Sequence, residues 1–169
     1  LIPGARRGIG PAPARVFAAA RARAVLAARD EAALGSLANE LDDDGHEALP
    51  VATDVTSAAA VERAVWQAVN HFGQLDIAFN NAGMSFRPTP LADLALSDFE
   101  RLMTVNATGV FLAMKYEIPA MIDAGGGVIV NMASTAGMKA VPGIAPYVAS
   151  KHAVIGLTKV AALDYAAQG

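Results

Sequence analysis

The stretch LIPGARRGIG, residues 1–10, decides the fold class, because a short apolar segment runs directly into a turn with glycine at positions 4, 8 and 10. A helical pattern follows to about residue 20. Glycine permits a tight turn and the close approach of a pyrophosphate, whose charge then meets free N–H groups at the helix N-terminus. The spacing is wider than the usual Gly-x-Gly-x-x-Gly fingerprint, so the stretch alone is equally typical of a plain turn.

Outward from this turn, short apolar runs alternate with longer amphipathic ones. The predicted strands are residues 23–28, 47–52, 75–79 and 128–133, and the predicted helices are residues 30–42, 57–73, a long helix opened by a capping box at Ser97-x-x-Glu100, and residues 146–167. Pro119 is expected to kink or end the third of these helices. Strands separated by helices predict a doubly wound α/β fold, in which helices cover both faces of a parallel sheet and ligands bind beyond the carboxyl ends of the strands.

The composition fits one globular domain over residues 1–169. With 54% hydrophobic and 17% charged residues, the chain has too much apolar surface for a disordered protein. It contains no cysteine, which excludes disulfides, thiolate metal sites and a cysteine nucleophile and favours a reducing, cytoplasmic location. The scattered histidines His46, His71 and His152 predict no metal site.

Neither a membrane nor a nucleic acid is expected as a partner. No run approaches the roughly 18 consecutive apolar residues of a membrane helix. Residues 1–29 hold six arginines and no acid, which resembles a targeting signal, but arginines interrupt every apolar run there. Nucleic-acid binding by this segment disagrees with the net charge of −3 (13 − 16) and with the lack of an aromatic platform between the arginines.

The sequence Tyr147-Val148-Ala149-Ser150-Lys151 places a phenol and an ammonium on one face of the last predicted helix. The cation favours the phenolate form, which suits proton transfer, although chance placement produces the same spacing. Ser134 directly follows the predicted strand of residues 128–133. At that edge its hydroxyl either polarises a substrate carbonyl or simply forms a turn.

Asparagines mark two further positions. The sequence Asn80-Asn81-Ala82-Gly83, at a strand end, is typical of a turn whose side-chain amides tie neighbouring strands together. Asn106 lies inside a predicted helix, where asparagine is unfavourable. With Thr104, Thr108 and Gly109 nearby, it predicts either a local distortion that aims the amide into the cleft or a solvent-facing side chain.

The order and spacing of these motifs together resemble the classical short-chain dehydrogenase/reductase family over essentially the whole chain. The matching segments are Gly4-x-x-x-Gly8-Ile9-Gly10, Asp54-Val55, Asn80-Asn81-Ala82-Gly83, Asn106, Ser134 and Tyr147-x-x-x-Lys151. The resemblance implies a Rossmann-type fold and hydride transfer between a nicotinamide cofactor and a carbonyl or secondary alcohol. It also implies a homo-oligomer, commonly a tetramer, built through the two long helices. A catalytically silent dinucleotide-binding module is the alternative from another functional class.

By the same resemblance, Tyr147 is the acid/base, Lys151 assists it and binds the nicotinamide ribose, Ser134 holds the substrate oxygen, and Asn106 keeps a water in a proton relay. The implied cofactor-binding residues lie in the glycine turn, after the strands and in the helix of Tyr147. They are Gly4, Arg7, Gly8, Ile9, Gly10, Arg29, Asp54, Val55, Asn80, Ala82, Gly83, Tyr147 and Lys151.

The end of the strand at residues 23–28 bears on the choice of cofactor. NAD-dependent relatives place an acid there, which bonds the ribose 2′-hydroxyl, whereas this chain has Ala28 followed by Arg29. Arg29 and Arg7 suit the 2′-phosphate of NADP, because a guanidinium matches phosphate geometry. NAD remains the alternative, since Asp30 can serve a ribose, although it can also cap the next helix.

Three residues depart from the family pattern. Pro3 removes a hydrogen-bond donor from a central strand, Arg6 replaces a small residue in the glycine turn, and Arg21 stands where relatives carry glycine after the first helix. Relatives continue at both ends, so we expect these 169 residues to be about two thirds of a domain, a fragment with poor stability and little activity alone. The segment Met138 to Gly143 predicts an apolar wall for a lipophilic substrate.

Overall fold

The computed structural model describes residues 1–6 and 9–169. Its strands are β1 (Ile2–Pro3), β2 (Ala24–Ala28), β3 (Ala48–Ala52), β4 (Ile77–Asn80) and β5 (Val128–Asn131). Its α-helices are α1 (Pro11–Ala19), α2 (Glu31–Asp43), α3 (Ala58–Phe72), α4 (Leu96–Met103), α5 (Gly109–Asp123) and α6 (Ala145–Tyr165). Strands and helices therefore alternate as the periodicity predicts.

All strand pairs are parallel. β1 pairs with β2 and β2 with β3, while β4 pairs with β5. Backbone hydrogen bonds from Phe79 N to Leu1 O (2.9 Å) and from Asn81 N to Pro3 O (3.3 Å) join the two sets along the edge between β1 and β4. The strands thus lie in the order β3-β2-β1-β4-β5, which confirms the predicted doubly wound, Rossmann-type α/β sheet.

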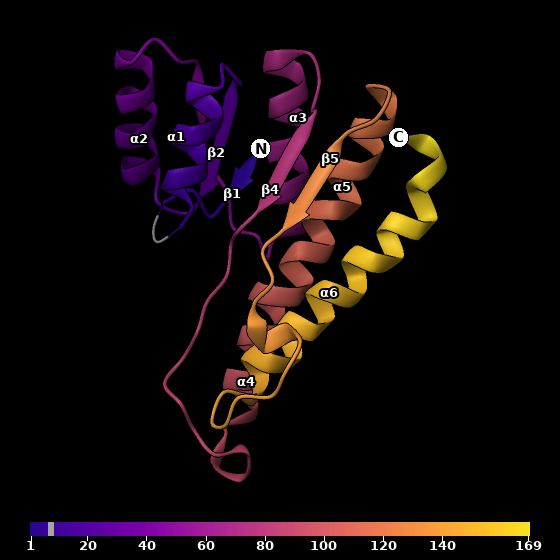
Figure 1. Cartoon of the computed structure of the whole chain (residues 1–169). Coiled ribbons are helices and arrows are strands. Elements are labelled where there is room, and N and C mark those ends of the chain that lie inside the picture. The colour runs from indigo at the N-terminus through magenta and orange to yellow at the C-terminus, as the bar shows by residue number, and fades with distance from the viewer. Residues whose placement is uncertain (7–8) are drawn as a thin grey trace.

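Helices cover both faces of the sheet (Figure 1), and alternate residues of β2 pack toward opposite faces. Ala24 and Leu26 face α1 and α2, where they pack with Leu34. Val25 and Ala27 face the opposite side, where they pack against α3 together with Met121 of α5. Most of these residues are alanine, valine and leucine, so the helices pack close to the sheet.

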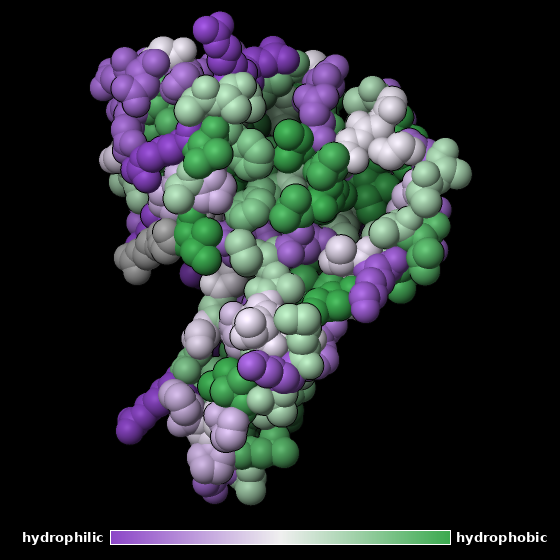
Figure 2. Space-filling view, viewed as in Figure 1, coloured by the Kyte–Doolittle hydropathy of each residue, from purple (hydrophilic) through white to green (hydrophobic). Residues whose placement is uncertain are grey.

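On β5 one face stays open. Ile129 packs under α5 and α6, whereas Val128 and Val130 point the other way and are exposed. Figure 2 shows apolar side chains gathered where β4 and β5 lie in Figure 1.

None of the helices in the described ranges combines the length and apolar character that a membrane span requires.

Local sequence explains most helix ends. Asp30 caps α2 by accepting from Ala33 N (3.1 Å), and Ser57 caps α3 by accepting from Ala60 N (3.3 Å). Gly73 ends α3 in the left-handed conformation (φ 89°). Arg21 has φ 64°, which confirms the strained position expected after the first helix, at a cost of roughly 1 kcal/mol.

The predicted capping box of the long helix is wrong, and of the two outcomes predicted at Pro119, a kink or an end, the structure contradicts the end. The capping box at Ser97 is not used, because α4 already begins at Leu96 and its first turn has Ala95 as an N-cap without a side-chain bond. Pro119 does not end α5, which continues to Asp123. Pro119 is exposed, so the helix keeps its buried face on the sheet while the proline ring lies on the outer one.

Candidate active site

The glycine turn and the loop after β4 meet backbone to backbone. A Cβ built on Gly4, which has φ 84°, would lie 2.8 Å from the Ala82 backbone, and Asn81 Nδ2 donates to Gly4 O at 3.3 Å. A Cβ on Gly10 would lie 2.0 Å from Gly4 O. Glycine is therefore required at both positions, because only a residue without a side chain lets these backbone segments approach so closely. Arg7 and Gly8 lie outside the described residues.

The same loop leads to Asn106 and Lys151. A Cβ on Gly83 would lie 3.4 Å from Asn106 Oδ1 and 3.8 Å from Lys151 Nζ. Asn106 is fully buried. It accepts from Met84 N at 2.7 Å, donates to Met84 O at 2.9 Å and donates to Ser150 Oγ at 3.3 Å. Its amide therefore ties the loop after β4 to α6.

A π-helical turn, Thr104–Thr108, connects α4 to α5 and contains Asn106. Gly109 N donates to Thr104 O, so the helical bond is one residue longer than in an α-helix. Gly109 packs against Val55, whose side chain would lie 3.1 Å from an added Cβ. The local distortion that the sequence predicts at Asn106 is present, and the solvent-facing alternative is wrong.

Lys151 and Tyr147 lie one turn apart on α6. Lys151 Nζ lies 5.6 Å from the centroid of the Tyr147 ring and donates to Met132 O at 2.7 Å. The Lys151 side chain is only 4% exposed, and this burial lowers its pKa. The structure thus brings together a phenol and a buried ammonium that is bonded to a neutral carbonyl.

Ser134 follows β5 and caps a short 3₁₀ turn, Thr135–Gly137, by accepting from Ala136 N at 3.2 Å. This turn packs directly on α6, because a Cβ on Gly137 would lie 2.8 Å from Lys151 O. The partly buried Ser134 therefore lies at the carboxyl end of β5, beside the helix that carries Tyr147 and Lys151.

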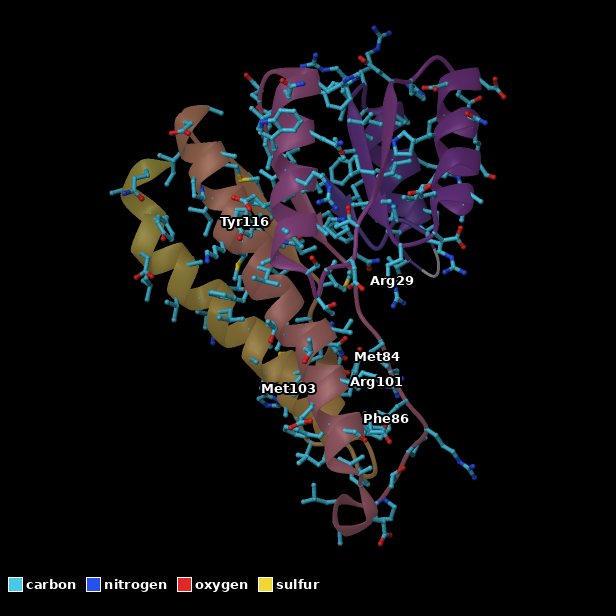
Figure 3. All side chains as sticks on the ribbon, turned by 180° about the vertical axis from the view of Figure 1, so that it is seen from behind. Arg29, Met84, Phe86, Arg101, Met103 and Tyr116 are labelled. Atoms are coloured by element: carbon cyan, nitrogen blue, oxygen red, sulfur yellow. The ribbon has the colours of Figure 1, made fainter. Side chains whose placement is uncertain are left out.

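A cleft of about 360 Å³ runs along the carboxyl ends of the strands. Among the predicted cofactor-binding residues, its walls contain Gly4, Arg29, Asp54, Val55, Ala82 and Gly83. Ile9 is exposed, and Gly10 lies beneath Gly4 rather than in the wall. Figure 3 shows Arg29, Met84 and Arg101, three of its residues, following one another along one side of the molecule.

The cleft is basic. The described side chains that line it include Arg6, Arg29 and Arg101 and a single acid, Asp54. Hydrogen bonds from Thr56 N (2.9 Å) and Thr56 Oγ1 (2.8 Å) hold the pKa of Asp54 below its usual value. Arg6 pairs with Asp30, and Arg101 pairs with Asp98 at 3.0 Å. Arg29 forms no ion pair in the described part of the structure, so Arg29 is the cleft cation best able to bind a phosphate.

Sequence reasoning missed Arg101 as a cleft residue. It comes from α4, far along the chain from the other arginines, and only the packing of α4 beside the loop after β4 brings it there. Arg6, noted as a departure, pairs through Nε with Asp30 Oδ2 at 3.0 Å. Asp30 is thus occupied both by this ion pair and by its N-cap bond.

Asn80 and Glu117 form a second polar centre, behind the cleft. Asn80 is buried, and its Nδ2 donates to Glu117 Oε2 (2.9 Å) and to Asn131 Oδ1 (3.0 Å). The cleft wall is formed instead by its neighbour Asn81. Burial raises the pKa of Glu117 to about 7. The sequence analysis missed Glu117, although it shares the buried helical stripe of Val110, Ala113, Met114 and Met121.

Comparison with known proteins agrees with this geometry. The family model described as "short chain dehydrogenase" matches residues 1–169. The chain is 45% identical over 170 residues to an A-factor type gamma-butyrolactone 1'-reductase (1S-forming) of Streptomyces virginiae, covering all of this chain and 66% of that protein. It is 39% identical over 169 residues to a cyclohexanol dehydrogenase of Acinetobacter sp. (strain SE19), and the match covers 100% of this chain and 67% of that protein.

A third relative is a 2,5-dichloro-2,5-cyclohexadiene-1,4-diol dehydrogenase of Sphingobium indicum, 42% identical over 171 residues, covering 100% of this chain and 67% of that protein. The chain therefore spans about two thirds of the length of these curated relatives. The match over all residues, together with the parallel sheet and the glycine turn, shows that this chain belongs to the short-chain dehydrogenase family.

Proposed function

We propose that the protein is an oxidoreductase that transfers a hydride between NADP(H) and a carbonyl or secondary alcohol. The observation that carries this proposal is the pair of Lys151 and Tyr147, a buried ammonium 5.6 Å from a phenol ring, next to a basic cleft with a glycine turn. A catalytically silent dinucleotide binder has no need of a buried lysine beside a phenol, because burying a charge is unfavourable.

Each side chain of the site has a distinct role in this proposal. The cofactor, when bound, supplies the hydride. Tyr147 donates its phenolic proton to the carbonyl oxygen in reduction and accepts a proton in oxidation, while Ser134 donates a hydrogen bond to the same oxygen. Lys151 stabilises the phenolate and binds the nicotinamide ribose. Asn106 keeps a water molecule in the path that returns the proton.

The cleft residues fit a dinucleotide. Gly4, Gly8, Ile9 and Gly10 would form the pyrophosphate turn at the start of α1, where free N–H groups and the helix dipole favour an anion. Asp54 and Val55 would contact the adenine. Asn80, Ala82 and Gly83 would form the wall opposite the glycine turn, with Asn80 acting from behind it because its side chain is buried.

NADP is the proposed cofactor, with NAD as the alternative. Arg29 follows the last residue of β2 and lines the cleft, so its guanidinium, with that of Arg7, suits a 2′-phosphate. Asp30 is a weak argument for NAD, because its carboxylate already binds Arg6 and caps α2 and is therefore less available to a ribose hydroxyl.

Replacing Arg29 with alanine should weaken NADPH binding by about 10- to 100-fold, the worth of a charge-assisted bond to phosphate. NADH binding should change little, because NADH lacks the 2′-phosphate. Fluorescence titration of both cofactors measures this. Arg87→Ala, at an exposed position outside the cleft wall, is the matched control. Tighter binding of NADH than NADPH by the unaltered protein would disprove the NADP assignment.

The substrate is proposed to be lipophilic. The segment Met138 to Gly143 approaches the loop after β4, where Thr89 N donates to Gly143 O at 2.8 Å, and Met138 is exposed there. Two of the relatives are named for six-membered carbocyclic alcohols. A panel of cyclic and open-chain ketones with NADPH, assayed on the whole protein, tests the function, and failure of that protein to turn over any of them favours the silent binder.

Assembly and location remain predictions. A homo-oligomer through α5 and α6 fits the exposed apolar side chains of Phe111, Val160 and Leu163 on these helices. The proposed location is cytoplasmic, because the chain has no cysteine.

A further inference from the structure

Glu117 is the one acid among the described residues whose side chain is fully buried, yet the proposed reaction does not use it. It lies on α5, on the face that packs toward β4. A buried carboxylate normally pairs with a cation, but no lysine or arginine in the described part of the chain forms an ion pair with it. Its direct bond is to the neutral amide of Asn80.

Two buried oxygens remain unpartnered at this bond. Asn80 Oδ1 and Glu117 Oε1 both lack a hydrogen-bond partner in the described structure, although Asn80 Nδ2 already donates to Glu117 Oε2. A proton on Glu117 Oε1 supplies the missing donor, because it can bond Asn80 Oδ1 and complete a two-bond acid–amide pair. An ionised carboxylate offers no such donor and leaves both oxygens unsatisfied in a buried place.

From Asn80 a chain of short bonds continues to the site. Asn80 O accepts from Met132 N at 2.9 Å, and Met132 O accepts from Lys151 Nζ at 2.7 Å. The Asn80 side chain also bonds Asn131, whose Nδ2 donates to Thr158 Oγ1 of α6 at 2.9 Å. These hydrogen bonds therefore connect α5, β4, β5 and α6.

We propose that Glu117 is a positioning residue that, as a neutral acid sharing its proton with Asn80, fixes Asn80, the Met132 peptide and through them the ammonium of Lys151. The consequence for catalysis rests on the function proposed above. Burial, which raises the pKa of Glu117 to about 7, supports the neutral form.

Two variants separate the possible roles. Glu117→Gln keeps one acceptor and gains an N–H donor, so it reproduces the bonds of the neutral acid. Glu117→Leu keeps a similar volume and removes both bonds. Met121→Ala is the matched control, because it truncates a buried side chain of the same helix in the neighbouring apolar cluster.

The first readouts do not depend on activity. The infrared spectrum of the unaltered protein at pH 6 minus that of Glu117→Gln should contain the C=O band of a protonated carboxyl group, because the variant lacks that group. Acetic anhydride labelling followed by mass spectrometry should modify Lys151 at least several-fold faster in Glu117→Leu than in the unaltered protein or in Glu117→Gln. Absence of the band, or equal labelling in all three, would overturn the proposal.

The kinetic readout addresses positioning. Glu117→Leu should lower kcat by about 10- to 100-fold and move the acid limb of the pH–rate profile for alcohol oxidation, because a displaced ammonium stabilises the phenolate less. Glu117→Gln should retain the pH–rate profile of the unaltered protein. Met121→Ala should lower Tm but leave the pH–rate profile unchanged. If Glu117→Leu lowers only Tm, Glu117 is merely structural. Absence of turnover in the whole protein would refute the proposed function, while the band and the labelling would still decide the role of Glu117.

Discussion

Replacing Tyr147 with phenylalanine is expected to lower kcat for ketone reduction by roughly 10³-fold, within the range of a lost general acid. The substitution removes only the phenolic oxygen, so the ring stays in place beside Lys151. Affinity for NADPH should remain within about a factor of two, because the residues proposed to contact the phosphates and the adenine line a cleft whose described walls do not include Tyr147. Steady-state kinetics and fluorescence titration on the same preparation measure the two quantities.

Tyr165→Phe is the control for this experiment. Tyr165 lies on the same helix but at its far end, where it is 41% exposed, so its hydroxyl should not affect turnover. An unchanged kcat in Tyr147→Phe would remove Tyr147 from the mechanism. A parallel fall in kcat and NADPH affinity would instead assign the tyrosine a binding role.

Replacing Gly10 with alanine is expected to abolish cofactor binding and to destabilise the protein by about 3 kcal/mol or more. The added Cβ would lie 2.0 Å from Gly4 O, 2.8 Å from Gly4 C and 2.9 Å from Ala5 Cα, which are all backbone atoms. The expected effect is purely steric, because Gly10 has φ −52° and ψ −41°, angles that alanine adopts readily. The glycine turn must therefore move, and with it the proposed pyrophosphate site.

Gly35→Ala provides the contrast. Gly35 lies inside α2, and an added Cβ there meets no atom within 4 Å, so this variant should gain roughly 0.5–1 kcal/mol from the better helix propensity of alanine. Urea unfolding of both variants gives the comparison, and NADPH titration gives the binding. Equal stability and equal binding of the two variants would show that the turn adapts easily and would contradict the argument from close packing.

Periodicity predicted the fold well, because the apolar runs of β2 and the amphipathic faces of α2 and α3 are local features of the sequence. The cap residues Asp30 and Ser57 and the terminating Gly73 are local as well, and the structure uses all three. The capping box at Ser97 failed because the helix starts two residues earlier than that motif requires, with Ala95 rather than Ser97 as its N-cap. Helix starts are set partly by packing, which single motifs do not report.

The site was predictable where its residues share one element. Tyr147 and Lys151 lie on one face of α6, and the helical period alone places them together. Arg101 was not found because the other arginines of the cleft come from distant segments, and Glu117 was not found because its partner Asn80 lies on β4. For Glu117 the signal was an acid in an apolar helical stripe, which indicates a buried partner but does not say which one.

The contacts of Asn106 depend on the number of residues in the π-helical turn Thr104–Thr108, which joins α4 to α5. The turn holds one residue more than a turn of α-helix, so deleting a single residue here would let α4 and α5 continue as one regular α-helix. Asn106 would lose the widened backbone that directs its amide, and its bonds to Met84 and Ser150 would break together. A deletion in this segment therefore acts on the contacts of Asn106 rather than on the direction of α5.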